Sequence, residues 1–438
     1  MASLTNNTPA FTAVHGHSPW GALLSRSMPT YSGEHKVGVR DAEFMVEKET
    51  KGTFARRHVE GQEPKIGFEL ETVMFTLFYP CKPEKGQSSK VIWFPRLEPT
   101  IAGLLKMGNK ANLAYKWLAH FCASILTAGT TFPAHKDARL LPPPDSKPYP
   151  LIIFSHGVGA PRLMYSAFCG ELASRGYVVA NMEHRDGTVP STVITLEDQT
   201  MRTIEFINWT DVHWPDLETQ PEDETSFRKD QLIMRLAEID GAIEAIRLIN
   251  KGEKIRVGPE NREGFNRDQW MGNIDIDNYV LAGHSFGGTA VIAAAADPRF
   301  NPRAIIATDP AMQRLDPWKG QITCPFLSVN SEEFADSDDF DRLLAATKTV
   351  QNESTVLTIP GSTHPSFCDV FLILPGMINR RAGLTASPMK VLNETIKACE
   401  HFLRGTIGTV ISACDPVHGR QTKPFSRDVE GPMLIQTL

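Results

Sequence analysis

The fold of this chain is decided by one stretch of sequence, YVLAGHSFGGTAVIAAAA, at residues 279–296. It opens with four residues that suit a buried strand and closes with an apolar run, TAVIAAAA, that suits a buried helix. The turn between them, GHSFG at 283–287, matches G-x-S-x-G, a sharp strand-to-helix turn that exposes the hydroxyl of Ser285. Glycine is required on both sides because a side chain there would collide with the strand or the helix. A glycine-rich turn with an incidental serine is the alternative, and the flanking strand and helix argue against it.

Strands and helices alternate on both sides of this turn. Short apolar runs predict further strands at 70–79, 151–154, 177–180, 304–308, 325–329 and 355–359. One helix is predicted at 167–176, and apolar residues spaced three or four apart predict another at 232–246 that ends near Gly252. Such alternation is typical of a mostly parallel sheet with helices on both faces.

The composition is that of an ordinary globular protein. Of the 438 residues, 41% are hydrophobic, and 45 basic against 51 acidic side chains give a net charge of −6. This balance argues against a nucleic-acid binder that relies on bulk positive charge, so no nucleic-acid partner is predicted. No apolar run approaches the roughly 18 residues of a membrane span.

The sequence also bears on the location of the protein. The first residues lack the basic and apolar regions of a secretory leader, and Ala2 stands where N-myristoylation requires glycine. The seven cysteines are scattered and form no C-x-x-C pair, so neither a zinc site nor a disulfide framework is indicated. We therefore predict a cytoplasmic protein with reduced thiols, which could associate peripherally with membranes.

A serine nucleophile needs a general base, and only three histidines follow Ser285 in the chain. His364 lies in a loop directly after a predicted strand, where the base of such a site is expected. His401 lies within a helical pattern, and His418 lies in an irregular C-terminal segment. His364 is therefore the predicted base.

The acid that orients this base has two candidates. Asp309 directly follows the apolar run AIIAT at 304–308. The rival is an acidic loop after the predicted strand at 325–329, with the carboxylates of Glu332, Glu333, Asp336, Asp338 and Asp339. Position alone does not separate the two, although a run of charges is usually solvated surface.

Two backbone N–H groups are predicted to stabilise the oxyanion that forms when a serine attacks a carbonyl group. One belongs to Phe286, the residue after the nucleophile. The other belongs to Val158, in the turn HGVG at 156–159 that follows the predicted strand LIIF. The turn is a weak signal by itself and a useful one beside the G-x-S-x-G motif.

Several stretches resemble the platelet-activating factor acetylhydrolase family, a group of calcium-independent phospholipases A2. They are LFYPC (77–81), YPLIIFSHGVGAPRLMYSAFCGELASRGYVVA (149–180), EHRD (183–186), NIDIDNYVLAGHSFGG (273–288) and PGSTH (360–364). Their order and spacing agree with the family over about 37–405, and the similarity is greatest to the intracellular type II form.

The resemblance implies an α/β-hydrolase fold with Ser285 as nucleophile, Asp309 as acid and His364 as base. It thereby favours Asp309 over the acidic loop, and it implies Val158 and Phe286 as the oxyanion donors. The implied substrate is a phospholipid with an acetyl, short or oxidatively truncated sn-2 acyl chain, met at a membrane or micelle surface. The resemblance implies no cofactor and no metal.

Four features depart from the family pattern. The aromatic segment that follows the catalytic acid is replaced by PAMQ at 310–313, and Pro161 stands where the family tends to have phenylalanine. Both changes lie near the expected acyl pocket, so the acyl preference is left open. The lipidated N-terminal glycine of the type II form is missing, and residues 1–36 have no match.

Two segments are candidates for contact with a membrane surface, and each could equally be a core element. Residues 111–126 predict an amphipathic helix with cationic flanks. Its apolar face includes Leu113, Trp117, Leu118 and Phe121. The second candidate is the run FLIL, which begins with Phe371 and Leu372.

One catalytic domain is predicted at 37–405, because nucleophile, acid, base and oxyanion turn must meet at one edge of a sheet. Residues 1–36 then form an N-terminal tail and 406–438 a C-terminal extension. The leading hypothesis is a serine esterase that acts on platelet-activating factor-like phospholipids through an acyl-enzyme. The alternatives are a carboxylesterase of soluble short-chain esters and an inactive lipid-binding protein. The oligomeric state is not indicated.

Overall fold

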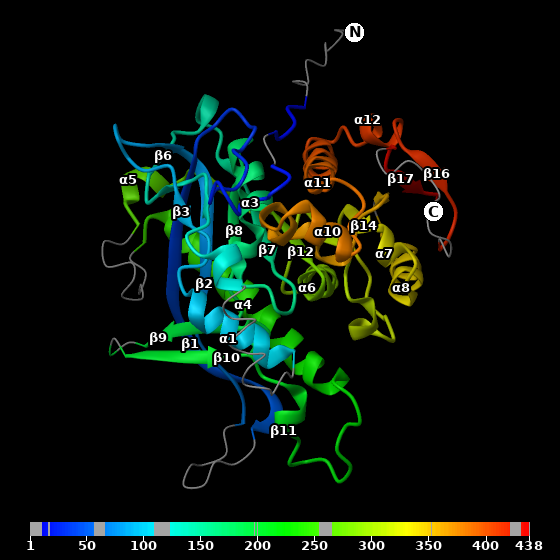
Figure 1. Ribbon diagram of the computed structural model, residues 1–438. Helices are drawn as coiled ribbons and strands as arrows, with labels where there is room; N and C mark the ends of the chain where they lie inside the picture. Colours follow the sequence, from blue (N-terminus) through cyan, green and yellow to red (C-terminus); the bar gives the residue numbers. More distant parts are fainter. Residues whose placement is uncertain are drawn as a thin grey trace.

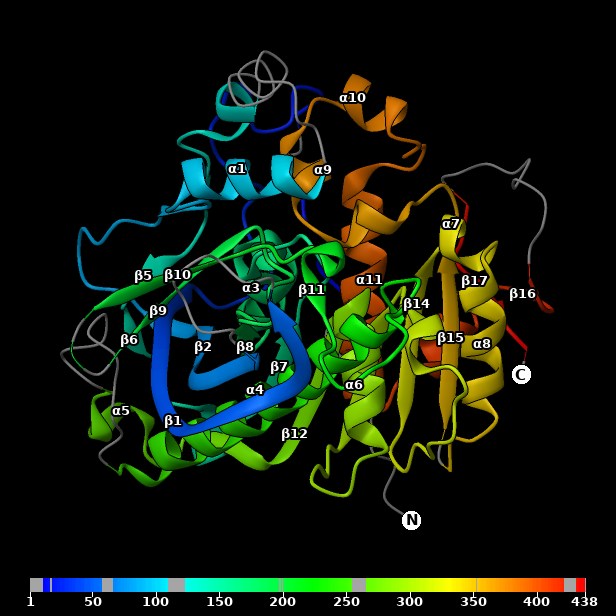
Figure 2. The same ribbon diagram turned by 90° about the horizontal axis from the view of Figure 1, so that it is seen from below.

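The computed structural model describes residues 11–15, 18–56, 66–108, 123–196, 198, 200–253, 265–351, 353–420 and 431–437. Its centre is a mixed sheet of 13 strands with helices packed on both faces (Figures 1 and 2). This is the α/β-hydrolase architecture that the sequence predicts.

The main path of the sheet runs β11-β1-β2-β8-β7-β12-β13-β14-β15-β17-β16. In chain order these strands are β1 (Val37–Arg56), β2 (Ile66–Lys82), β7 (Tyr149–Ser155), β8 (Val178–Met182), β11 (Val212–His213), β12 (Ile274–His284), β13 (Ala304–Thr308), β14 (Phe326–Ser331), β15 (Ser354–Ile359), β16 (Asp415–Val417) and β17 (Leu434–Gln436). Neighbours from β8 to β15 pair in parallel, whereas β1, β2 and β17 add antiparallel strands at the two sides.

Shorter strands complete the description. Two pair with the main sheet, β5 (His135–Lys136) with β1 and β6 (Arg139–Leu140) with β2. Two separate ribbons are formed by β3 (Val91–Ile92) with β4 (Thr131–Phe132), and by β9 (Ser191–Thr195) with β10 (Met201–Glu205).

The helices include several short ones. The α-helices are α1 (Leu97–Met107), α3 (Ser166–Ser174), α4 (Thr225–Lys251), α5 (Arg267–Trp270), α6 (Phe286–Ala295), α7 (Glu332–Ala335), α8 (Asp338–Thr347), α9 (Val370–Ile373), α10 (Gly376–Arg381), α11 (Pro388–Leu403) and α12 (Gly408–Ile411). The 3-10 helices are η1 (Pro144–Ser146), η2 (Arg162–Tyr165), η3 (Trp209–Asp211), η5 (Met312–Leu315) and η6 (His364–Phe367).

Both faces of the parallel strands are buried, each against its own pair of helices. Leu281 belongs to the cluster that contains residues of α4 and α6, whereas its neighbour Val280 belongs to the cluster with α3 and α11. The same alternation recurs at Ile305 and Ile306 in β13. Because successive side chains of a strand point to opposite faces, a continuous apolar run is what a doubly covered strand requires.

The predicted strands and the helices predicted at 167–176 and 232–246 are present, with differences mainly at their ends, whereas most of the helix predicted at 111–126 lies outside the described residues. β13 occupies the expected residues, and α4 ends at Gly252, whose left-handed φ of 68° closes the helix. α4 starts at Thr225, earlier than predicted, because Phe227 and Gln231 are buried on the same helix and extend its packed face.

The segments outside 37–405 pack against the central fold where they are described. Ala22 and Met28 are buried, and Ser27 forms a bridge with Thr131. At the other end of the chain, β17 pairs with β15 and extends the sheet.

Among the described helices, none combines the length and the apolar character that a membrane crossing requires. Six described cysteines have free thiols.

Candidate active site

The candidate nucleophile lies at a strained turn between β12 and α6. Ser285 has φ 56° and ψ −124°, a backbone conformation that residues other than glycine rarely adopt. A Cβ atom added to Gly287 would lie 1.9 Å from the carbonyl oxygen of Ser155, and one on Gly283 would lie 2.4 Å from the backbone of Gly287. The close approach of the strand and the helix therefore demands both glycines of the motif.

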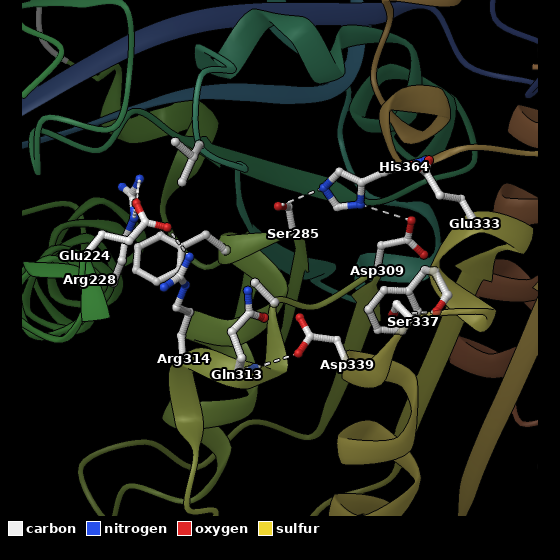
Figure 3. A pocket seen from close by; sticks show the side chains of 14 residues that line it. Glu224, Arg228, Ser285, Asp309, Gln313, Arg314, Glu333, Ser337, Asp339 and His364 are labelled. Atoms are coloured by element: carbon white, nitrogen blue, oxygen red, sulfur yellow. Dashed lines mark hydrogen bonds and ion pairs between the residues drawn. The ribbon is translucent and has the colours of Figure 1, made fainter. Parts of the chain in front are cut away.

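Ser285, His364 and Asp309 form a continuous hydrogen-bonded chain (Figure 3). The Nε2 atom of His364 lies 3.0 Å from the Ser285 hydroxyl oxygen, and its Nδ1 atom lies 3.1 Å from Oδ2 of Asp309. All three lie at the C-terminal ends of the parallel strands β12, β13 and β15, which meet at one edge of the sheet. This geometry suits proton transfer from serine to histidine, with a carboxylate orienting the ring.

The carboxylate of Asp309 is buried and accepts hydrogen bonds from the end of the neighbouring strand β14. Its Oδ1 accepts the backbone N–H of Ser331 at 2.7 Å, and its Oδ2 accepts the Ser331 hydroxyl at 2.6 Å. Asp309 itself has a positive φ of 43°, directly after β13. The carboxylate of Asp309 therefore contacts the His364 ring, whereas Glu332 and Glu333 of the rival acidic loop contact backbone N–H groups.

Two carboxylates of that loop hold the backbone around His364. The N–H of His364 donates to Glu333 at 2.7 Å, and the N–H of Gly361 donates to Glu332 at 2.5 Å. Both glutamates begin α7, which directly follows β14. Their contacts brace the histidine loop through its main chain, so the ring nitrogens stay available to Asp309 and Ser285.

The electrostatic surroundings raise the pKa of His364. Burial alone would lower this pKa, but the hydrogen bond and the negative charge of Asp309 outweigh that effect, with further support from the charges of Glu333 and Asp339. A raised pKa makes the imidazole a stronger proton acceptor, which helps a general base to take the serine proton.

The turn that carries Val158 is held on both sides. The N–H of Gly157 donates to the Tyr165 hydroxyl at 3.1 Å, and the N–H of Gly159 donates to the Thr188 carbonyl at 2.8 Å. Val158 and Phe286 line the same pocket as Ser285, as the prediction of two oxyanion donors requires. As the first residue of α6, Phe286 has an N–H with no partner inside its helix.

Tyr165 joins this turn to the nucleophile. Its hydroxyl accepts the Gly157 N–H and lies 2.8 Å from Nδ1 of His284, the residue before Ser285. Burial lowers the pKa of His284 well below its ordinary value, so its ring is neutral and Nδ1 can accept the tyrosine proton. One buried hydroxyl therefore connects the two backbone segments that must face the same carbonyl group.

The EHRD run at 183–186 forms part of a buried charged layer beneath the site. Asp186 pairs at 2.8 Å with Arg235, which also donates to the carbonyl of His156 at 2.5 Å. The guanidinium of Arg235 lies 4.6 Å from the ring centre of Phe286. Arg235 thus contacts both the oxyanion turn and the residue after the nucleophile.

The site opens into a pocket of about 400 Å³. Its wall combines the catalytic candidates with a set of charged and polar side chains (Figure 3). That set includes Glu224, Arg228, Gln313, Arg314, Glu333 and Asp339. A pocket of this kind can accept a small ester that also carries polar or charged groups.

The side-chain ligand atoms of His284, Asp309 and His364 lie within 4.8 Å of one another, a spacing that a metal ion could bridge. Both ring nitrogens of His364 are engaged, with Ser285 and with Asp309, and Nδ1 of His284 is engaged with Tyr165. These contacts fit a serine–histidine–carboxylate site.

Of the two segments predicted to contact a membrane, the structure describes the candidate side chains of only the second. Leu113, Trp117, Leu118 and Phe121 lie outside the described residues. Phe371 and Leu372 are only 4% and 5% exposed, since α9 packs into the core. Contrary to the sequence-based hypothesis, these two side chains therefore present no apolar patch to the surroundings.

Sequence reasoning did not find Tyr165, Arg235 and the pocket arginines. Their roles depend on contacts between residues far apart in the chain, such as the 119 positions between Tyr165 and His284. The one signal available was the charged run EHRD directly after a buried strand, a place where charges must find partners.

The chain is similar to proteins of one family over most of its length. The family model described as platelet-activating factor acetylhydrolase, isoform II, matches residues 21–410. A dog protein named platelet-activating factor acetylhydrolase is 32% identical to this chain, over 80% of this chain and 69% of the dog protein. A chicken protein of the same name is 28% identical, over 87% of this chain and 83% of the chicken protein. Among solved structures, a ferulic acid esterase from Streptomyces cinnamoneus matches with TM-score 0.49 and 19% identity, covering 86% of this chain and 93% of that one. Because the family match spans most of the chain, the chain belongs to the platelet-activating factor acetylhydrolase isoform II family.

Proposed function

We propose that this protein is a serine esterase that hydrolyses the sn-2 ester of phospholipids resembling platelet-activating factor. The sn-2 group would be acetyl, short or oxidatively truncated. The observation that carries the proposal is the Ser285–His364–Asp309 chain, with contacts of 3.0 and 3.1 Å, in the wall of the pocket. Family membership supports the choice of substrate class.

The reaction proceeds through an acyl-enzyme. The Ser285 hydroxyl attacks the ester carbonyl while Nε2 of His364 takes its proton, and the tetrahedral intermediate then expels the lysophospholipid alcohol, which receives that proton. A water molecule, activated by the same imidazole, next attacks the acyl-serine ester and releases the carboxylic acid. Asp309 keeps the ring oriented and stabilises the imidazolium in both halves.

The negative charge of each tetrahedral intermediate would be stabilised by the N–H groups of Val158 and Phe286. Each such donor lowers the barrier by about 3 kcal/mol in comparable enzymes. The buried contacts of Tyr165 and Arg235 hold this part of the site, so the donors are oriented before the substrate arrives.

Replacement of the nucleophile tests the mechanism. Ser285→Ala should lower kcat on a short-chain ester by at least about 10⁴-fold, because no neighbouring group can replace the hydroxyl. A fluorophosphonate probe should label the wild-type protein and not the variant. Wild-type turnover by Ser285→Ala would refute the proposal, and a wild-type protein that escapes labelling would favour the inactive lipid-binding alternative.

The substrate class requires a separate experiment. Phospholipids with graded sn-2 chains, from acetyl to long acyl, should be hydrolysed with kcat/KM falling steeply as the chain lengthens. Product analysis by mass spectrometry would show whether the lysophospholipid and the short acid are released. Cleavage that is independent of chain length contradicts this assignment.

A carboxylesterase of soluble short-chain esters is the second candidate, and two observations favour it. The pocket wall is rich in charged side chains, and the predicted patch at Phe371 and Leu372 is buried. Equal rates on micellar acetyl phospholipid and on a soluble p-nitrophenyl ester, without binding to liposomes, would select this candidate.

A membrane-facing surface, if the first proposal holds, would lie beside α10. Trp20, Leu24 and Met377 are 56%, 73% and 63% exposed. The segments that carry them are joined, because the Ala22 N–H donates to the Ile373 carbonyl at 2.9 Å. Liposome sedimentation of the wild-type protein and of a Leu24→Ser, Met377→Ser variant tests this surface.

The cytoplasmic location stays a prediction, which cell fractionation would test.

A further inference from the structure

The pocket in front of Ser285 has a corner where two arginines meet one glutamate. Arg228 and Glu224 come from α4 and the residue before it, and Arg314 comes from η5, a few residues after Asp309. Figure 3 shows the three side chains grouped on the side of Ser285 that is away from His364. We call this group the arginine corner.

Glu224 orders the arginine corner by contacting both guanidinium groups. Its Oε2 accepts hydrogen bonds from Arg228 at 2.8 and 3.1 Å, and its Oε1 accepts one from Nη2 of Arg314. The remaining nitrogen of Arg228 donates to Gln231 at 2.7 Å. Within the described part of the chain, Nε and Nη1 of Arg314 donate to no protein acceptor, so Arg314 keeps N–H groups for another ligand.

Within the arginine corner itself two guanidinium groups face one carboxylate, and the charges of Asp223 and Asp339 also act on Arg314 from outside the corner. Each of the other carboxylates in the pocket already accepts a hydrogen bond, Asp309 from His364, Glu333 from the His364 N–H and Asp339 from the Gln313 N–H at 2.8 Å. The Arg314 side chain is only 17% exposed, so water screens its charge weakly.

We infer that Arg314, oriented by Glu224, binds an anionic group of the ester substrate while Ser285 attacks the carbonyl carbon. This rests on the proposed esterase function. The anion is either the phosphate of the alcohol part or a carboxylate at the far end of a truncated acyl chain. A guanidinium suits both, because its parallel N–H groups match the oxygens of either anion.

Two matched pairs of soluble esters separate these sources. One pair is 1-butyl-2-acetylglycerol 3-phosphate against its 3-O-methyl ether, which lacks the phosphate. The other is the p-nitrophenyl monoester of glutaric acid against p-nitrophenyl valerate, which lacks the terminal carboxylate. The measured quantity is the ratio of kcat/KM for the anionic ester to kcat/KM for its neutral partner.

Arg314→Gln should lower this ratio about tenfold for one pair, since a charge-assisted hydrogen bond is lost. The pair that responds identifies phosphate or carboxylate as the recognised group. Arg314→Lys should lie between the wild-type protein and Arg314→Gln, because it keeps the charge without the planar pair of donors. The variant leaves Glu224 paired with Arg228, so the carboxylate does not become a buried lone charge.

Arg299→Gln is the matched control, since it also removes one arginine charge, and Arg299 pairs with Asp297 away from the pocket. It should leave both ratios unchanged. Added salt should lower the responding ratio in the wild-type protein and much less in Arg314→Gln. Ratios within twofold of wild type for both pairs overturn the inference, while Ser285-dependent hydrolysis of the neutral esters keeps the esterase proposal intact. Failure of the wild-type protein on all four esters would instead count against the esterase proposal.

Discussion

Ser285 occupies a backbone conformation that is costly for a residue with a side chain. Strain of this kind costs roughly 1–3 kcal/mol and persists only when the surroundings impose it. Here the contact of Gly287 with the Ser155 carbonyl and the glycine at 283 impose it. The strain points the hydroxyl away from both the strand and the helix, toward His364.

The pKa of His364 leads to a prediction about pH. Because its folded-state pKa is raised above the ordinary 6.5, the base becomes protonated, and kcat/KM falls, as the pH drops through that raised value. Asp309→Asn removes the main stabilising charge, so the descending limb should move to lower pH, and kcat should fall on the order of 10⁴-fold. A pH–rate profile of both proteins measures the two effects.

Glu333→Gln provides the control for that experiment. Glu333 also raises the pKa of His364, but it acts on the ring only through charge and holds the backbone N–H through an oxygen that glutamine retains. In Glu333→Gln we expect the acid limb of the pH–rate profile to move to lower pH as well, but by less than in Asp309→Asn. An acid limb that stays in place in Asp309→Asn would contradict the assigned role of Asp309.

At the scale of elements, the site depends on contacts between segments that no single helix or strand provides. η2 contributes Tyr165, β7 leads into the turn at Gly157, and β12 ends at His284. The tyrosine hydroxyl bonds to both segments at 3.1 and 2.8 Å. It therefore sets the distance between the oxyanion turn and the nucleophile.

Removal of that hydroxyl should affect turnover more than binding. Tyr165→Phe leaves the Gly157 N–H buried without an acceptor, which costs about 1–3 kcal/mol of stability, and it frees the turn to shift. We expect kcat to fall about tenfold with KM within twofold of wild type, because oxyanion donors act mainly in the transition state. Steady-state kinetics on a soluble ester and a urea unfolding curve measure both.

Tyr79→Phe is the matched substitution. Tyr79 is equally buried, and its hydroxyl donates to the Ala138 carbonyl at 2.8 Å, in another part of the core. The Tyr79→Phe variant should lose about as much stability as Tyr165→Phe, while its kcat stays at the wild-type value. Equal losses of kcat in the two variants would mean that Tyr165 acts through stability alone.

At the scale of the whole molecule, segments near both ends of the chain join one sheet and its covering layers. β17 pairs with β15 through Leu434 and Ile435, and Leu434 is buried. The loop to His364 begins where β15 ends. The C-terminal segment thus supports the strand from which the catalytic base is positioned.

Removal of residues 415–438 should therefore destabilise the protein and weaken catalysis. Loss of buried side chains such as Met433 and Leu434 should lower the free energy of unfolding by about 3 kcal/mol or more. The exposed edge of β15 should also promote association between molecules. Urea unfolding, light scattering and kcat together measure these effects.

Leu434→Ala separates the two causes, because it removes core contacts while the backbone ladder stays paired. It should lower stability by about 2–5 kcal/mol without promoting association. A truncated protein that unfolds at the wild-type urea concentration and remains monomeric would show that β15 does not need this cover.

The sequence by itself determined the features that depend on local backbone sterics and on periodicity. The spacing of GHSFG specified a strand, a strained turn and a helix, and apolar runs marked strands such as 304–308. The base followed from chain order, since only His364 among the later histidines lay just after a strand. The strand, turn and helix assignments need only neighbours within a few residues, and the choice of His364 needs only the order of residues along the chain.

Tertiary structure decided what depends on distant partners. From position alone Asp309 and the acidic loop were equivalent, and the resemblance to a family favoured Asp309. The fold placed one carboxylate on the imidazole ring and two others on the backbone of its loop. It buried Phe371, which hydropathy marks equally for a core or a membrane. It also brought Arg314 to Glu224, which is 90 positions away in the chain, whereas Arg228 lies only one helical turn from Glu224.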